Sequence, residues 1–167
     1  MGFLMFLSRK ITLQHRESDL TYQLTSISSK LQDYTRFASI LSQDTISLND
    51  ISDMPASIFQ NGLANLNYIN GAAAQIAQQN MAQAAGTGMF NGNQNLQMIA
   101  HQKMYENARK ELQKQLQARL NEEEKALQSK KTRLDAELTI VQQELEKMDS
   151  QIGRGIKNQL SGYGLQG

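Results

Sequence analysis

Apolar residues recur through the last third of the chain at the spacing of a coiled coil. After a first interval of seven residues, they stand alternately four and three residues apart, as the a and d positions of successive heptads do. We call these positions the C-terminal seam. They are Leu127, Leu134, Leu138, Val141, Leu145, Met148 and Ile152. From Gln97 to Ile156 there is no proline, and no glycine before Gly153, so the pattern predicts one long helix.

A second set of apolar positions with the same spacing lies near the start of the chain. We call it the N-terminal seam. It consists of Leu13, Leu20, Leu24, Ile27, Leu31, Tyr34, Ala38 and Leu41. The intervening positions carry mostly polar residues, which predicts an amphipathic helix with a narrow apolar stripe. Because serine and threonine are mediocre helix formers, we expect packing against a partner to hold this helix.

The middle of the chain has a different pattern. Asp44–Pro55 contains the only proline and predicts a loop or a short helical turn. Residues 56–85 predict a helix rich in alanine and glycine, whose small side chains would let another helix approach closely. The glycines and asparagines of residues 85–95 then predict a turn. We expect a connector there, with an exposed contact through Met89 and Phe90 as the alternative.

The two ends of the chain predict different structures. Residues 1–7, MGFLMFL, are too few for a signal-peptide core or a membrane span. They predict either a frayed or docked helix start, or an apolar tip that a neighbouring subunit or a membrane surface covers. Glycines from Gly153 onward predict that the long helix ends near Ile156 and leaves a glycine-containing tail.

Together these patterns predict an all-α fold: an elongated antiparallel helical hairpin or coiled coil, with a third Ala/Gly-rich helix between the two long helices. The expected segments are 1–43, an N-terminal heptad helix; 44–95, a weakly charged middle; 96–156, a long helix; and 157–167, a tail. We expect Leu127 to Ile152 to pair with Leu20 through Leu41, and the first half of the long helix to face the middle segment.

Charge and composition exclude several classes of function. The chain has 17 Lys and Arg against 16 Asp and Glu, so no global bias favours nucleic acid or an anionic membrane. It has no cysteine, which excludes disulfides and thiolate metal sites. Between Phe37 and Gln102 there is no Lys or Arg and there are only three aspartates, so this part is expected to pack against something.

Residue patterns that carry chemistry are lacking. His15 and His101 are the only histidines, and Asp19, four residues after His15, is expected to be its solvated neighbour. The glycines near Gly88 lack the lysine of a phosphate-binding loop. From Glu122 to Arg133, a block of glutamates is followed by basic residues, and no aromatic residues lie among them. This pattern indicates a solvated helix face. We therefore expect no enzymatic activity, no cofactor, no metal and no nucleic-acid partner.

The layout of Leu13–Leu41 and Leu127–Ile152 around a weakly charged centre, without cysteine, resembles filament proteins of type III secretion and flagellar export systems. The resemblance lies in architecture and covers about a third of the chain. It implies export of an unfolded chain without a cleavable signal, followed by assembly with the terminal helices lining the filament core.

We therefore expect a structural protein that self-assembles into a filament or another homopolymer. Its expected partners are copies of itself and, beyond these, other structural or export proteins. The assembly contacts are assigned to the C-terminal seam and to Leu20, Leu24, Ile27, Leu31, Tyr34 and Leu41. The expected location is an extracellular filament or a virion. The alternative is a helical component of a virion or secretion machine that binds other chains; membrane contact through residues 1–7 is less favoured.

Overall fold

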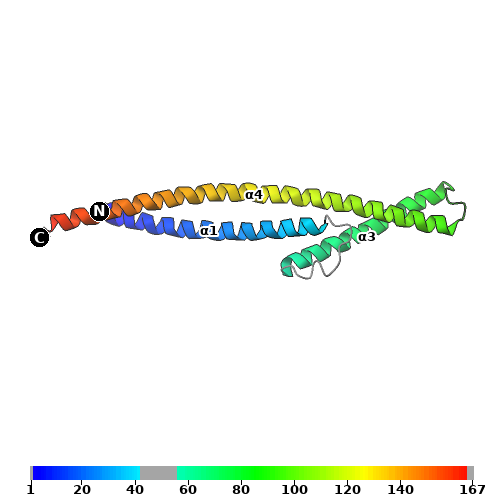
Figure 1. Cartoon of the computed structure of the whole chain (residues 1–167), viewed down its shortest axis with the longest axis horizontal. Helices are drawn as coiled ribbons and strands as arrows, with labels where there is room; N and C mark the ends of the chain where they lie inside the picture. Colours follow the sequence, from blue (N-terminus) through cyan, green and yellow to red (C-terminus); the bar gives the residue numbers. More distant parts are fainter. Residues whose placement is uncertain (1, 42–55, 165–167) are drawn as a thin grey trace. The chain divides into compact units, whose positions relative to one another are not determined.

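The structure, a computed structural model, describes residues 2–41 and 56–164, which are almost entirely helical. Helix α1 spans Gly2–Leu41, α3 spans Ala56–Gly86 and α4 spans Gln94–Gly162 (Figure 1). The expected all-α fold, with a third helix between two long ones, is confirmed. The loop or short helical turn predicted for Asp44–Pro55 lies outside the described residues.

Helix α4 is longer than the sequence pattern predicted. It continues past Ile156 to Gly162, so the expectation of a tail beginning at residue 157 was wrong. A glycine inside a helix costs about 1 kcal/mol relative to alanine, yet Gly155 lies against α1, where an added Cβ would stand 3.7 Å from the Phe3 ring. Packing against α1 therefore offsets part of that cost. Gly164, with a positive φ of 71°, follows the helix end, as in a common C-terminal cap.

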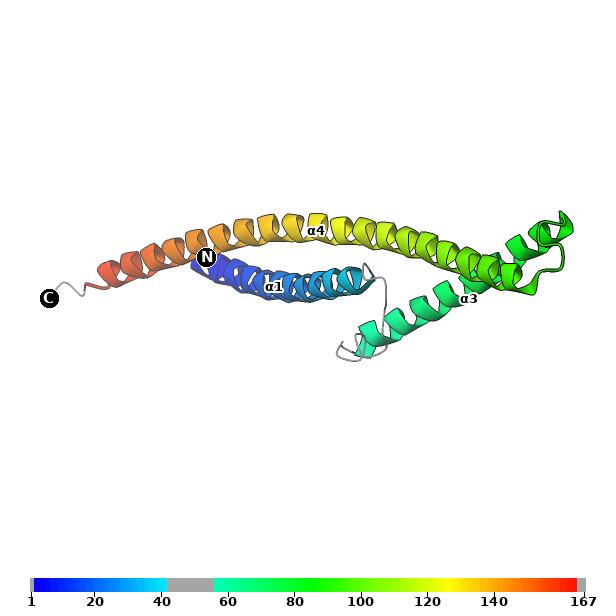
Figure 2. The same cartoon turned by 45° about the vertical axis from the view of Figure 1, so that its right-hand side comes forward.

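The chain divides into two compact units, which we call unit 1 and unit 2. Unit 1 contains residues 1–31 and 126–167. Within it, the first part of α1 runs antiparallel beside the last part of α4, as both views show (Figure 1, Figure 2). Its core consists of Leu13, Leu20 and Val141, with Leu134, Leu138, Leu145 and Met148 packed against them. These are the alternating seam positions, so the antiparallel helical hairpin is confirmed.

Unit 2 contains residues 32–125 and brings three helices together: the end of α1, α3 and the first part of α4. Its core consists of Phe37, Ile40, Leu41, Leu66 and Leu120, with Tyr34 and Leu116 packed against them. The expected pairing of Tyr34 and Leu41 with the C-terminal seam was therefore wrong. Two positions per heptad suffice against one partner helix, whereas two partners require the wider apolar face that Phe37 and Ile40 supply.

Helices α3 and α4 pack closely within unit 2. Ala73 and Ala77 have no exposed surface and Ile69 has 1%, so small side chains line the contact, and both views show the two helices crossing (Figure 1, Figure 2). The Tyr105 hydroxyl is 3.3 Å from Oδ1 of Asn70, to which it donates a hydrogen bond. These contacts agree with the expectation that the first half of the long helix faces the middle segment.

A tight turn joins α3 to α4. Gly88, Asn91 and Gly92 take positive φ angles of 72°, 41° and 74°, which glycine and asparagine tolerate best. The side chain of Asn93 then caps α4: its Oδ1 accepts hydrogen bonds from the backbone N–H groups of Asn95 and Leu96, at 3.1 and 3.3 Å. The turn predicted for residues 85–95 thus lies where the sequence placed it.

Candidate functional site

The described side chains offer little for chemistry. Among residues 2–41 and 56–164, no group of three or more histidines, aspartates and glutamates is placed to hold a metal ion. His15 and His101 are both exposed. A surface depression on α4 beside Lys130, Arg133 and Glu137 is lined by that helix alone, so it is a groove between successive turns. The candidate sites are therefore exposed surfaces that could contact a partner.

The seam residues are covered by the chain itself. None of those assigned to assembly contacts is fully exposed. Leu20, Ile27, Leu41 and Val141 are buried, and the others are half-buried. Their apolar surface is thus largely occupied by packing inside each unit. A contact between copies through the same residues stays a prediction, and exposed apolar residues elsewhere are the stronger candidates.

Charged pairs align the two helices of unit 1. Arg9 of α1 pairs with Glu144 of α4. One heptad later on α1, Arg16 pairs with Glu137, which lies one heptad earlier on α4. Both the hydrogen bond and the negative charge of Glu137 raise the pKa of Arg16. Charges beside a coiled-coil seam set partner choice and orientation, so this row favours the antiparallel alignment.

A second row lies on the other flank of the same seam. Lys10 pairs with Asp149, and one heptad along, the Gln142 side-chain amide donates a hydrogen bond to Glu17 at 3.3 Å. Exposed ion pairs add little stability singly. Two rows that repeat at the heptad interval nevertheless favour this register, because a shift by less than a heptad would break every pair and a shift by a whole heptad would leave residues of each row without their partners.

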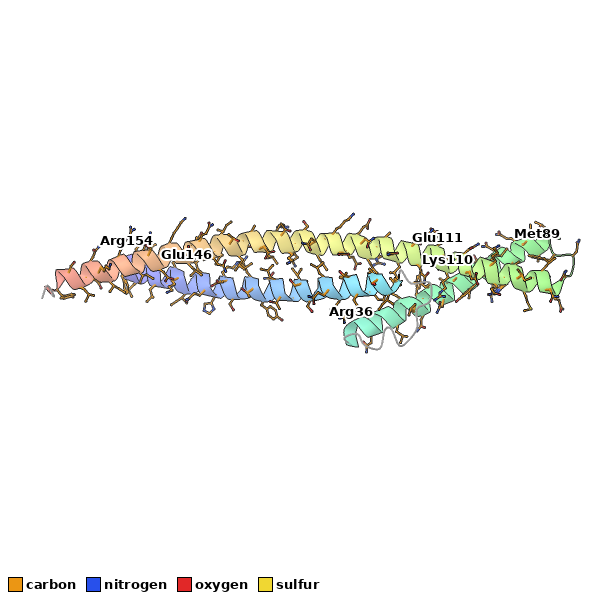
Figure 3. The ribbon with its side chains drawn as sticks, viewed as in Figure 1. Arg36, Met89, Lys110, Glu111, Glu146 and Arg154 are labelled. Atoms are coloured by element: carbon orange, nitrogen blue, oxygen red, sulfur yellow. The ribbon has the colours of Figure 1, made fainter. Side chains whose placement is uncertain are left out.

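The first candidate surface lies where α3 and α4 are joined. We call residues 76–99 of unit 2 the hairpin tip. No charged residue occurs in it. Its exposed large apolar residues are Ile76, Met89, Leu96, Met98 and Ile99. Met98 is 72% exposed and Ile99 64%, and Figure 3 shows Met89 at the turn itself.

The hydrogen bond between Tyr105 and Asn70 sets the register of the hairpin. From this bond toward the turn, Ile76 on α3 and Ile99 on α4 are the same number of residues away. These two exposed residues therefore stand at the same level of the hairpin. Met89 is exposed, as the alternative reading of the turn expected, but Phe90 is only 7% exposed and is not available as a contact. The burial of Phe90 helps to anchor the turn.

The second candidate surface lies in unit 1, where α1 begins and α4 ends. We call residues 2–11 of α1 and 150–164 of α4 the basic end. Its charged residues are all basic: Arg9, Lys10, Arg154 and Lys157. Its exposed large apolar residues are Leu4, Met5, Phe6, Leu7, Ile11, Ile156, Leu160 and Tyr163. Figure 3 shows Arg154 at the end of α4 that lies beside the first turns of α1.

Unit 2 contains two polar groups with unusual surroundings. Nε of Arg109 and Nε2 of Gln113 are buried without a hydrogen-bond partner, one turn apart on α4. Burial comes first among the causes that raise the pKa of Tyr34 above its ordinary value, followed by hydrogen bonding to Glu123 and the negative charge of Glu123. Both features bear on the stability of unit 2.

Some features of the hairpin tip were not predicted from the sequence. Among them is the exposure of Leu96 and Met98. The absence of Asp, Glu, Lys and Arg from Met54 to Gln102 was the signal that could have marked the hairpin tip. Within the described ranges, no helix is both long and apolar enough to cross a membrane. No protein-family model, curated protein or solved structure matches this chain.

Proposed function

We propose that this protein is a structural protein that self-assembles, and that the hairpin tip makes a contact between copies. The observation that carries this proposal is the combination of exposed large apolar residues with a complete lack of charge over residues 76–99. Contiguous exposed apolar surface on a soluble protein commonly marks an interaction site. Two uncharged tips can also approach each other without like-charge repulsion.

The apolar side chains at the tip provide the driving force. Fully burying a side chain such as Ile99 or Met98 contributes roughly 1.5–3 kcal/mol relative to leaving it exposed. Side chains on both copies contribute at a self-complementary contact, because each residue occurs once on each side. The cost of association, which is several kcal/mol, is then within reach of a few such residues.

The location of the seams supports a contact outside them. Leu20 and Val141 are already buried within unit 1, and Leu41 and Leu120 within unit 2. Opening either unit to share these residues with another copy would first expose them to water. Contacts through the tip require no such opening, so assembly through the tip is the less costly route.

The form of the assembly depends on how the tips meet. A self-complementary contact between two tips closes on itself and gives a dimer, whereas a filament requires contact between two different surfaces. The architectural resemblance to export filament proteins favours the second arrangement. The tip would then meet a different part of the next copy.

Sedimentation velocity and negative-stain electron microscopy of the purified chain test the proposal. We expect particles larger than a monomer, and we expect the double variant Met98→Lys/Ile99→Lys to shift them to monomer, because burying an unpaired lysine is costly. Tyr22→Lys/Ile140→Lys is the matched control: these residues are 75% and 57% exposed, but they lie in unit 1. We expect the control to assemble like the wild type.

Two outcomes would contradict self-assembly. One is a monodisperse monomer of the wild-type chain across protein concentration, salt and pH. The other is a stable complex that forms only with a different chain and is lost in Met98→Lys/Ile99→Lys; this result would instead assign the tip to a component of a larger machine. Equal loss of assembly in the Tyr22→Lys/Ile140→Lys control would show that added charge alone, and not the tip, is responsible.

A further inference from the structure

We propose that the basic end of unit 1 binds the surface of an anionic phospholipid bilayer, with the first turns of α1 inserted among the lipid headgroups. This proposal goes beyond self-assembly and does not depend on it. It rests on three observations: apolar residues around the whole circumference of α1, basic residues without acidic neighbours in the sequence, and a matching apolar face on α4.

The first observation concerns four consecutive residues of α1. Leu4, Met5, Phe6 and Leu7 are 69%, 76%, 36% and 38% exposed. Successive residues of an α-helix point about 100° apart, so these four surround the helix. We call them the apolar collar. A folded protein partner covers one face of a helix, whereas fluid lipid can cover every side, so the collar suits a bilayer interface better than a rigid groove.

The second observation concerns charge. Arg9 and Lys10 follow the collar, and the first acidic residue of α1 is Glu17. On α4, Arg154 and Lys157 lie beyond Asp149, the last acidic residue of that helix. Arg9 and Lys10 are bridged to Glu144 and Asp149. No ion pair is formed by Arg154 or Lys157 with any part of the chain that the structure describes, so their charge is available to anionic headgroups.

The third observation concerns α4. Ile156, Leu160 and Tyr163 are spaced four and three residues apart, so they share one face of that helix, and they are 44%, 51% and 84% exposed. Gly155 lies against Phe3, which places this face beside the start of α1. Tyrosine is enriched at membrane interfaces, where its ring is in an apolar region and its hydroxyl meets water.

The exposed apolar residues of the basic end suit shallow insertion. Interfacial helices lie in the plane of the membrane surface and bury an apolar face about 5–10 Å into the boundary between headgroups and acyl chains. In this arrangement Arg154 and Lys157 remain at headgroup level. Insertion of this kind requires no membrane-spanning helix.

A second copy of the chain fits the basic end less well. Two basic ends brought together would set Arg154 and Lys157 against their own counterparts. A contact between the basic end and the acidic residues Glu122–Glu124 of another copy avoids this repulsion, but it leaves most of the collar in water. A bilayer both neutralises the charges and covers the collar.

Vesicle flotation of the full chain tests the proposal. We expect it to float with vesicles of phosphatidylcholine mixed with phosphatidylglycerol, and to bind phosphatidylcholine alone at least about tenfold more weakly. Leu4→Gln/Met5→Gln should weaken binding to the mixed vesicles by at least about tenfold. The matched control is Tyr22→Gln/Ile140→Gln, which removes two exposed apolar side chains of unit 1 that lie outside both candidate surfaces and should leave vesicle binding unchanged.

The basic residues have their own variant. Arg154→Gln/Lys157→Gln should abolish the preference for anionic vesicles, because each basic residue near such a surface contributes about fivefold to binding. Lys130→Gln/Arg133→Gln removes the same charge from α4 away from the basic end and should keep the preference. Loss of the preference in both pairs would show that net charge alone is responsible, and would overturn the assignment to the basic end.

A fluorescence measurement reports insertion directly. The chain contains no tryptophan, so Leu4→Trp introduces a single indole. We expect its emission to shift to the blue with the mixed vesicles and to be quenched by brominated lipids, whereas Tyr22→Trp, at an exposed position of α1 outside the basic end, should do neither. Unchanged Leu4→Trp emission would overturn the proposal. So would a result in which Leu4→Gln/Met5→Gln makes the particles smaller while no variant binds vesicles, because the collar would then contact a second copy.

Discussion

Nη2 of Arg9 lies 3.0 Å from Oε2 of Glu144, although 135 residues separate them in the chain. The pair joins the start of α1 to the last part of α4, and Arg16 with Glu137 repeats it one heptad along both helices. Each pair is exposed to solvent, so its contribution is more to alignment than to stability.

Reversing one charge of this pair should weaken unit 1, and reversing both should restore it. We expect Arg9→Glu and Glu144→Arg each to lower the free energy of unfolding, because each sets like charges together. The double variant should recover, with a coupling free energy of about 0.2–1 kcal/mol that shrinks at high salt. Thermal unfolding followed by circular dichroism measures it. A coupling of zero at low salt would show that the pair does not form in solution.

The buried seam residue Leu20 should dominate the stability of unit 1. Leu20 has no exposed surface and lies in the cluster with Leu13 and Val141. Leu20→Ala should therefore cost about 2–5 kcal/mol, seen in chemical denaturation as a lower midpoint. Tyr22→Ala, two residues away on the exposed side, should change the midpoint little. Equal effects of the two substitutions would contradict the assigned face of α1.

Spacing in the sequence was sufficient to predict the helices and their pairing in unit 1, because apolar a and d positions repeat without interruption from Leu20 to Ile27 and from Leu134 to Met148. It was insufficient where α1 changes partners. Apolar periodicity shows which residues require burial but not how many helices bury them. The added apolar positions Phe37 and Ile40 were the signal of a second partner.

The candidate surfaces were predictable in part. The lack of Lys and Arg between Phe37 and Gln102 is visible in the sequence, and so is the apolar run at residues 1–7. That Phe90 is buried while Met89 is exposed depends on the positive φ angles of the turn, which residue type alone does not determine. The position at which α4 ends was predicted wrongly, because the low helix propensity of glycine is visible in the sequence and the packing of Phe3 beside Gly155 is not.

The close contact between α3 and α4 should not tolerate a larger side chain. Ala77 has no exposed surface. Ala77→Leu adds three carbons to a closely packed site and should cost about 1–3 kcal/mol through strain and displaced backbone. Ala82→Leu, at an exposed position of the same helix, is the control and should be nearly neutral. Comparison of the two melting temperatures measures the difference; a neutral Ala77→Leu would contradict the tight crossing.

Removing a buried polar group from unit 2 should make the protein more stable. Nε2 of Gln113 is buried without a hydrogen-bond partner, which leaves it with an uncompensated loss of hydration. Gln113→Leu keeps a similar volume and should raise the free energy of unfolding by about 1 kcal/mol. Gln115→Leu, at an exposed position two residues on, should not. A lower melting temperature for Gln113→Leu would indicate that its amide is satisfied in solution.

The hydrogen bond from Tyr34 to Glu123 should give unit 2 a pH-dependent stability at alkaline pH. Burial, this hydrogen bond and the Glu123 charge raise the Tyr34 pKa above its ordinary value of 10.0. A group whose pKa is raised on folding stabilises the protein below its unfolded pKa and ceases to do so as pH rises through its folded pKa. Tyr34→Phe should therefore cost up to about 1 kcal/mol near neutrality, and the difference from wild type should shrink above pH about 10. Melting curves of both proteins across this range measure it, with Tyr22→Phe as the exposed control; a difference that stays constant with pH would show that Tyr34 does not donate to Glu123.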